Sequence, residues 1–153
     1  MNDTLALSSP SSTALGARSV RLLIVDDHPV VRSGLVGMLD SAVDIDVVGQ
    51  AVDGAAAVEL AGELAPDVVL MDLRMPGMDG VEATRRILAV SDPPRVVVLT
   101  TYDTDGDILP AVEAGAIGYL LKDSPREDIL AAVRAAAVGR GVLSPAVTSR
   151  LVE

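Results

Sequence analysis

Five short apolar runs recur along this chain, and their regular spacing most constrains the fold that it can adopt. They span residues 20–26, 46–51, 67–72, 95–100 and 117–122. The first four are rich in β-branched residues, and most are apolar on both faces, as in DVVLMD and RVVVLT. Strands that are buried on both faces are typical of a parallel sheet covered by helices. We therefore expect the segments between the runs to form those helices.

The intervening segments carry signals for the start or end of a helix. Asp79, with Glu82 three residues later, resembles a capping box for the third helix. Ser124 and Pro125 suit the N-cap and the first position of the fifth helix. The first helix has Pro29 in its first turn, and the second has Asp53 as a cap and stops before Pro66. The fourth has Asp107 as a cap, Pro110 in its first turn and Gly115 at its end.

Alternating strands and helices without an internal repeat predict a doubly wound α/β fold with right-handed crossovers. A five-stranded parallel sheet of this flavodoxin-like kind commonly has the order 2-1-3-4-5, here with five flanking helices. Residues 1–18 are rich in Ser and Thr, and we interpret them as a flexible tail before a folded domain at 19–141. Residues 142–153 have the pattern of another capped helix, which we interpret as the start of a linker toward a further domain.

Composition narrows the possible functions. A net charge of −10 argues against direct binding to DNA, which needs clustered Lys and Arg. Without cysteine, a disulfide framework or a thiolate metal site is excluded. The N-terminus lacks the pattern of a signal peptide, and no apolar stretch is long enough to cross a bilayer. We therefore expect a soluble cytoplasmic protein.

Polar side chains follow four of the five predicted strands at the point where each strand ends. They are Asp26-Asp27, Asp72, Thr100-Thr101 and Lys122. In open α/β sheets, ligands bind beyond the carboxyl ends of the strands, where these residues are expected to converge.

Three carboxylates that meet at one edge repel each other unless one is protonated or a hard cation lies among them. Mg²⁺ suits such a site because it prefers oxygen ligands and often takes only one or two carboxylates together with a phosphate. Lys122 offers a compact charge to a phosphoryl oxygen, and Thr100 offers a hydroxyl. Asp72 could then act as a nucleophile that forms an aspartyl phosphate.

The segments LLIVDDHPVVRSGL, PDVVLMDLRMPGMDG, VVVLTTYD and EAGAIGYLLKD resemble the receiver domain of bacterial two-component response regulators. The resemblance spans about residues 20–140, and it is strongest to the subfamily with a C-terminal helix-turn-helix output domain that binds DNA. It implies a sensor histidine kinase as phosphoryl donor and a homodimer formed on phosphorylation. It also implies that DNA is bound only by an output domain absent from this chain, which regulates transcription.

Carried over by residue, the resemblance implies that Asp72 is the phosphoacceptor and that Lys122 contacts the phosphoryl group. Asp26 and Asp27, with Asp72 and the backbone carbonyl of Arg74, would hold Mg²⁺. Thr100 and Tyr119 would form a switch pair, in which the hydroxyl moves toward the phosphoryl group and the ring follows it inward. One departure is Asp123, where many receivers have proline, so a cis peptide is not expected there.

Some neighbouring residues keep two interpretations. His28, the sole histidine, is a solvated loop residue before Pro29 or has a role at the acidic pair. Arg74 and Tyr102 could screen an acyl phosphate from water or simply lie on the surface. The acidic residues Asp103, Asp105 and Asp107 form a solvated loop or a kinase recognition site. The dimer surface is also open, between the first and fifth helices and the face of fourth helix, fifth strand and fifth helix.

Other functional classes fit the sequence less well. An aspartyl-nucleophile phosphatase typically needs a second acid just after the nucleophile, but Leu73 and Arg74 follow Asp72. A flavodoxin-type cofactor binder would need a phosphate-binding loop, and no Gly-rich motif of the dinucleotide-binding type is present. A degenerate or stand-alone receiver, used only for protein interaction, is the remaining alternative. We therefore expect no enzyme activity beyond the domain's own phosphorylation and dephosphorylation.

Overall fold

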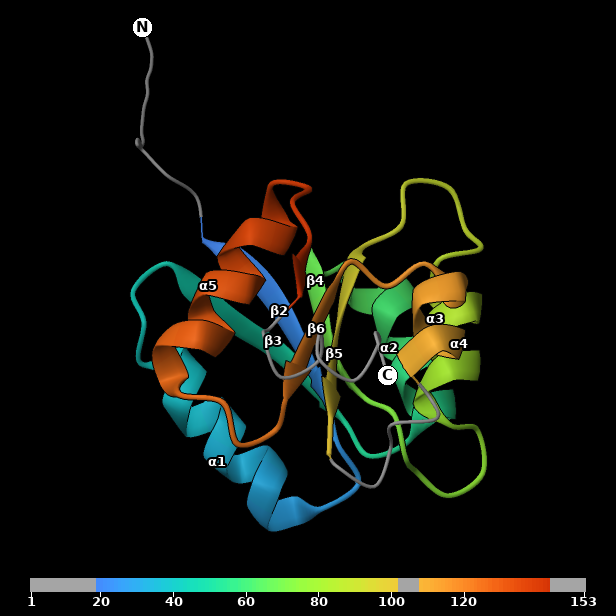
Figure 1. Ribbon diagram of the computed structural model, residues 1–153, viewed down its shortest axis with the longest axis horizontal. Coiled ribbons are helices and arrows are strands. Elements are labelled where there is room, and N and C mark those ends of the chain that lie inside the picture. The colour runs from blue at the N-terminus through green and yellow to red at the C-terminus, as the bar shows by residue number, and fades with distance from the viewer. Residues whose placement is uncertain (1–18, 102–107, 144–153) are drawn as a thin grey trace, which may run out of the picture.

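The computed structural model describes residues 19–101 and 108–143, which form a single twisted sheet with helices on both faces (Figure 1). In chain order the elements are β2 (Val20–Val25), α1 (Pro29–Asp40), β3 (Ile45–Ala51), α2 (Gly54–Leu64), β4 (Val68–Asp72), α3 (Gly80–Ile87), β5 (Arg95–Thr100), α4 (Ile108–Ala114), β6 (Gly118–Leu121), α5 (Arg126–Ala137) and β7 (Val142–Leu143). Each of the five predicted strands is present, with bounds that differ from the prediction by no more than one residue.

All strand pairs in the sheet are parallel, and the order is β3-β2-β4-β5-β6-β7. The first five of these positions confirm the predicted order 2-1-3-4-5. The sheet also has a sixth, two-residue strand, β7, which pairs with β6 through Gly118 and Tyr119. Val142–Leu143 therefore extend the sheet edge, whereas the sequence predicted that this segment begins a linker helix.

Two hydrophobic cores lie on opposite faces of the sheet, because successive strand residues point to opposite sides. Helices α1 and α5 cover one face, and α2, α3 and α4 cover the other (Figure 1). On the α1–α5 face the strands contribute Leu22, Ile24, Val68, Leu70, Val97, Leu99 and Leu120. On the other face they contribute Leu23, Val25, Val69, Met71, Val96, Val98, Tyr119 and Leu121. Burial on both faces explains the continuous apolar runs of the sequence.

Most of the predicted helix ends are confirmed. Asp53 caps α2 by accepting from the backbone N–H of Ala56, and α2 ends at Leu64, before Pro66. Gly115 follows α4 with a φ of +107°, a conformation that suits glycine. The predicted Asp107 cap lies outside the described residues, as do Tyr102, Asp103 and Asp105, and the segments 1–18 and 144–153.

Two helix starts differ from the prediction. Asp79 accepts from the backbone N–H of Glu82 as expected, but the Glu82 carboxylate binds Arg85 and Arg86 instead of returning to the cap. The predicted capping box is therefore only half formed. Helix α5 begins at Arg126 with Pro125 as its N-cap, one residue later than predicted, and the Pro125 carbonyl accepts from Asp128 and Ile129. Among the described residues, no helix is both long and apolar enough to span a membrane.

Candidate functional site

Strand register brings the predicted polar residues to one edge of the sheet. Val25 pairs with Met71, so Asp26 follows β2 beside Asp72, the last residue of β4. Asp72 pairs in turn with Leu99, and Thr100 pairs with Leu121. Because all these strands are parallel, Asp26, Asp72, Thr100 and Lys122 emerge at nearly the same level. The register of the parallel strands thus brings these residues together, as the sequence predicted.

A buried ion-pair network connects three of them. The Lys122 Nζ lies 2.9 Å from Asp26 Oδ2 and 3.2 Å from Asp72 Oδ1. The Asp26 side chain is fully buried and that of Asp72 is only 5% exposed, whereas Lys122 is 17% exposed. One ammonium therefore faces two carboxylates, and Asp27 adds a third at the partly exposed rim. The negative charge of this cluster exceeds its positive charge.

Burial and this excess of negative charge both affect the pKa values of the site. Burial raises the pKa of Asp72 to about 6, and the nearby charges of Asp26 and Asp27 add to the rise while Lys122 opposes it. For Lys122, burial alone would lower the pKa, but the contacts with Asp26 and Asp72 outweigh burial and raise it. Lys122 is accordingly a permanent cation of the site near neutral pH.

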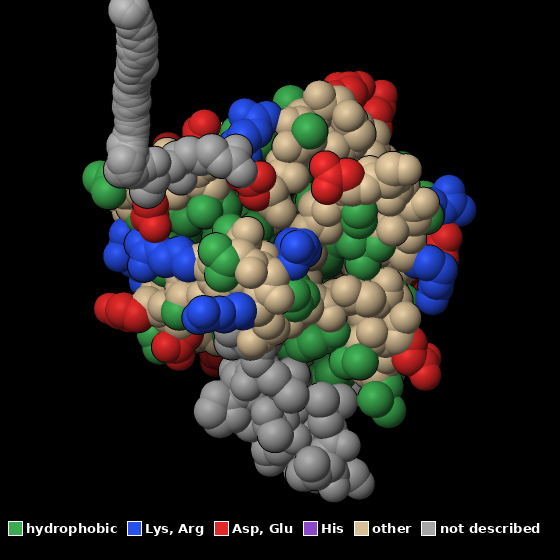
Figure 2. Space-filling view, turned by 90° about the horizontal axis from the view of Figure 1, so that it is seen from above, with side chains coloured by type: hydrophobic (Ala, Val, Ile, Leu, Met, Phe, Trp, Pro, Cys, Tyr) green, Lys and Arg blue, Asp and Glu red, His purple; other side chains and the backbone are tan. Residues whose placement is uncertain are grey.

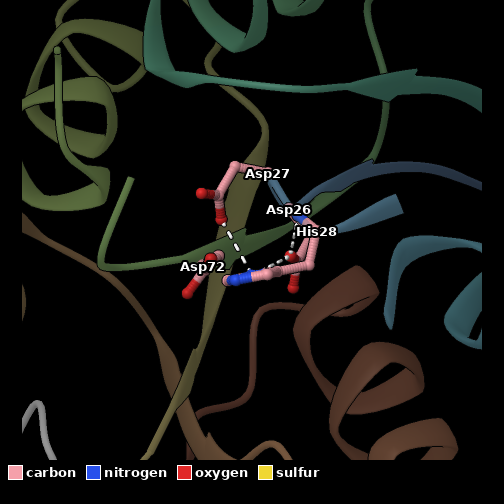
Figure 3. A group of neighbouring side chains, drawn as sticks. All are labelled: Asp26, Asp27, His28 and Asp72. Carbon is pink, nitrogen blue, oxygen red and sulfur yellow. Dashed lines mark hydrogen bonds and ion pairs between the residues drawn. The ribbon is translucent and has the colours of Figure 1, made fainter. Parts of the chain in front are cut away.

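Two buried oxygen atoms of the site have neither a hydrogen-bond nor an ion-pair partner among the described residues: Asp72 Oδ2 and Thr100 Oγ1. Leaving a buried polar atom unpaired costs about 1–3 kcal/mol, so such atoms indicate a missing ligand. Asp26, Asp27, His28 and Asp72 each offer a ligand atom within 4.8 Å of the others (Figure 3). This acidic cluster is typical of a Mg²⁺ site and fits the ion in donor type and net charge.

His28, for which the sequence left two interpretations, and Arg32, which the sequence did not identify, both contact the site. His28 is the N-cap residue of α1, and its backbone N–H donates to Asp26 Oδ1 at 2.8 Å. Its Nδ1 lies 3.2 Å from Asp27 Oδ1 while the side chain is 67% exposed, so the residue is both solvated and in contact with the acidic pair. Arg32, one turn along α1, donates to the Asp26 carbonyl at 2.8 Å. The Arg32 contact depends on how α1 docks against β2, whereas the His28 contacts are local, because Asp26, Asp27 and His28 are consecutive in the sequence.

The remaining predicted site residues surround this cluster. Arg74 is exposed two residues beyond Asp72. Tyr119 lies on β6 within the α2–α3–α4 core and is 6% exposed, with its hydroxyl donating to the Ala116 carbonyl. Burial raises the pKa of Tyr119, so the hydroxyl stays protonated. No described peptide bond is cis, in agreement with the expectation for Asp123.

A hollow of about 540 Å³ lies at the opposite end of the sheet, lined in part by Pro66, Asp67, Pro93, Pro94 and Arg95. Figure 2 views the molecule from that end, where acidic, basic and hydrophobic side chains are interspersed. Neither the ion-pair network nor the unpaired buried oxygens reach it. The candidate site is therefore the edge at the carboxyl ends of the strands that carries Asp26, Asp27 and Asp72 with Lys122, which we call the acidic edge.

Comparison with known proteins agrees with this geometry. Residues 22–134 match the family described as the response regulator receiver domain. The chain is 46% identical over 132 residues to the transcriptional regulatory protein LiaR of Bacillus subtilis, covering 86% of this chain and 63% of that protein. It is 44% identical over 127 residues to the nitrate/nitrite response regulator protein NarL of Escherichia coli, covering 83% and 59%. The chain thus spans about three-fifths of the length of these relatives.

Among solved structures, the signal receiver domain of the putative response regulator NarL from Mycobacterium tuberculosis superposes with a TM-score of 0.77. The two are 43% identical over 81% of this chain and the whole of that one. The matched family segment contains every residue of the acidic edge, and its members are signalling domains, not conventional enzymes. With both the fold and the acidic edge accounted for, this chain belongs to the response regulator receiver domain family.

Proposed function

We propose that Asp72 accepts a phosphoryl group from the phosphohistidine of a sensor kinase in a Mg²⁺-dependent reaction. The observation that supports this most is the Asp72 carboxylate itself, which is buried beside Lys122 with one oxygen unpaired. An Asp72 oxygen forms the new P–O bond while the P–N bond to the donor histidine breaks. The reacting carboxylate must be ionised, and its pKa of about 6 permits this near neutral pH.

The surrounding residues have separate roles in this proposal. Lys122, already in contact with Asp72, would interact with a phosphoryl oxygen, and Thr100 would donate its unpaired hydroxyl to another. Asp26, Asp27, Asp72 and the Arg74 backbone carbonyl would hold Mg²⁺. When bound, this ion neutralises charge on the phosphoryl oxygens.

The switch would begin at Thr100. Its hydroxyl is buried and unpaired, so a phosphoryl oxygen would give it a partner that the described structure lacks. Tyr119 would respond to that movement by changing how its ring packs. Its ring is already inside the core in this structure, so its response would be a change of packing there instead of entry from solvent. Phosphorylation would then bias a population shift between two surface arrangements.

LiaR is named as a transcriptional regulatory protein and NarL of Escherichia coli as a nitrate/nitrite response regulator, and both extend well beyond the matched segment. We propose that the receiver controls homodimerisation and a C-terminal output domain that binds DNA and regulates transcription. The receiver itself is a poor candidate for DNA contact, given its net charge of −10 and the mixed charges seen in Figure 2. A cytoplasmic location is part of the same proposal.

Intact-protein mass spectrometry after incubation with acetyl phosphate tests the chemistry. We expect a single phosphoryl adduct on the wild-type chain that requires Mg²⁺. The Asp72→Asn variant should form none while keeping its fold, and Asp67→Asn is the matched control because Asp67 lies at the opposite end of β4. An adduct on Asp72→Asn at the wild-type level would refute the assignment.

A further inference from the structure

We propose that His28 supplies a nitrogen ligand to the acidic site. The site would then bind divalent metals that accept nitrogen, such as Zn²⁺ and Co²⁺, more tightly than its carboxylates alone would allow. This inference rests on the proposed metal-binding role of Asp26 and Asp27. It adds a specificity-determining residue that acts on the metal.

The spacing of the donor atoms supports direct coordination. The His28 Nδ1 lies 3.2 Å from Asp27 Oδ1 and 3.5 Å from Asp26 Oδ1. Two ligands about 2.1 Å from one metal ion are about 3.0 Å apart at adjacent octahedral positions, and about 3.4 Å apart at tetrahedral ones. The observed distances are thus close to the edges of a coordination shell. Only a small movement of the ring would place all three atoms around one ion.

Local structure directs the imidazole toward the site. The His28 backbone N–H donates to Asp26 Oδ1, and Pro29 follows at the first position of α1. These constraints hold the residue at the edge, where its ring extends toward Asp72 (Figure 3). The ligand atoms of all four residues lie within 4.8 Å of one another.

A second, independent observation indicates a ligand at this position. Asp72 is 4% exposed, and its Oδ2 has no hydrogen-bond partner in the described part of the chain. Asp72 belongs to the same four-residue group as the imidazole, and its Oδ2 is not satisfied by Lys122, which contacts Oδ1. A cation held between His28 and the carboxylates would pair this oxygen and offset the excess negative charge.

Metal chemistry determines which ions should be affected. Mg²⁺ prefers oxygen ligands and retains several waters, so an imidazole adds little to its binding. Zn²⁺ and Co²⁺ accept imidazole nitrogen readily. The chain has one histidine and no cysteine, so His28 offers its only imidazole, and no thiolate competes for these ions. The predicted effect is therefore a change in the ratio of Zn²⁺ or Co²⁺ affinity to Mg²⁺ affinity.

Calorimetric titration of the untagged chain with each metal alone measures that ratio. We expect His28→Ala and His28→Gln to weaken Zn²⁺ and Co²⁺ binding at least about tenfold, since even groups that only orient a ligand cost 10–100-fold. Mg²⁺ binding should change less than about twofold. Val30→Ala is the matched control, because this neighbouring side chain on α1 is 84% exposed and has no metal-ligating atom. Equal losses for Mg²⁺ and Zn²⁺, or no loss for Zn²⁺, would overturn the inference.

Nuclear magnetic resonance of the single imidazole gives a direct readout. Stoichiometric Zn²⁺ should shift the ring ¹⁵N resonances of His28, whereas Mg²⁺ should not. Unmoved resonances during Zn²⁺ binding would show that the carboxylates alone hold the ion, and would contradict the proposal. Acetyl phosphate labelling of the wild-type chain in Mg²⁺ separates the two claims. Normal labelling of the wild type, with Zn²⁺ affinity lost in His28→Ala, supports both, while absent labelling of the wild type counts only against the phosphoacceptor role.

Discussion

At the residue scale, burying the charged side chains of the site is unfavourable. Two carboxylates face one lysine and a third lies at the rim, and Asp72 has a pKa of about 6 instead of its ordinary 3.8 because it is buried. An acid whose pKa is raised on folding stabilises the fold while it is protonated. That stabilisation is complete below pH 3.8 and is lost as the pH rises through about 6. At neutral pH the metal-free domain therefore holds an unfavourable buried charge.

We expect Asp72→Asn to stabilise the metal-free domain at pH 7.5, by up to about 3 kcal/mol for a pKa difference of this size. The reason is that the amide keeps the shape of the carboxylate without its charge. Urea unfolding of both chains at pH 7.5 and pH 4.5, with a chelator present, measures the difference. The difference in the free energy of unfolding should be smaller at pH 4.5. A variant less stable than the wild type at pH 7.5 would show that burial of the charge is not costly.

At the element scale, α3 is packed directly against the backbone of the phosphoacceptor. A Cβ on Gly80, the first residue of α3, would lie 2.2 Å from the Asp72 carbonyl oxygen and 2.6 Å from Leu73 Cα. The Gly80 N–H also donates to the Leu73 carbonyl at 2.8 Å. Neither backbone atom can move without displacing Asp72.

Gly80→Ala should therefore destabilise the domain by more than about 2 kcal/mol, as overpacking against backbone does. Gly34→Ala is the matched control, because Gly34 lies inside α1 and a Cβ added there would meet no atom within 4 Å. That control should be neutral or stabilising by about 0.5–1 kcal/mol. Chemical denaturation measures both variants. If Gly80→Ala were as stable as wild type, the close approach of α3 would not constrain the site.

Helix α5 is tied to the α1–β3 connection by an ion pair. Arg134 Nε and Nη2 donate to the two Asp44 carboxylate oxygens at 2.7 and 2.9 Å. This pairing lowers the pKa of Asp44. Its contribution is present above the pKa of Asp44 in the unfolded chain and is lost as the pH falls through the lower folded value.

Because both side chains are more than a third exposed, we expect Arg134→Met to cost no more than about 1 kcal/mol. The loss should shrink in 1 M salt and at acidic pH. Thermal unfolding in low and high salt, with Arg140→Met as a control near the end of the described chain, tests this. A cost that is independent of salt would indicate lost packing of the arginine stem instead of lost charge.

The elements also show what the sequence could predict and what it could not. Short apolar runs predicted β2 to β6, because burial on both faces leaves a strong pattern, and the strand order followed from what is common in flavodoxin-like sheets. The two residues of β7 carry no such pattern, and their pairing is decided by the β6 edge. Lys122, Asp26 and Asp72 could be placed together because parallel strands end at one edge. The Arg32 contact with the Asp26 carbonyl depends on helix docking, which spacing does not encode.

At the scale of the whole molecule, the acidic edge lies at the carboxyl ends of the strands, and among the described residues the opposite end has a hollow without such a cluster. A phosphoryl group bound at Asp72 would therefore influence partners through the elements that meet at the acidic edge. Helix α1 reaches it through His28 and Arg32, and β5 and β6 reach it through Thr100 and Lys122.

We expect phosphorylation to shift the chain from monomer toward dimer. Sedimentation velocity with and without acetyl phosphate and Mg²⁺ measures the change, and Asp72→Asn should remain monomeric under both conditions. Dimerisation of Asp72→Asn to the same extent would show that association is independent of the phosphoryl group.

The most direct test of the central claim is to locate the phosphoryl group. Borohydride reduces an aspartyl phosphate to homoserine, and tryptic cleavage after Arg32 and Arg74 releases one peptide that contains Asp72. Tandem mass spectrometry of this peptide distinguishes Asp72 from its other aspartates, such as Asp40, Asp53 and Asp67. We predict homoserine at position 72 alone, and only after incubation with both acetyl phosphate and Mg²⁺. Homoserine at another aspartate, with Asp72 unmodified, would contradict the account.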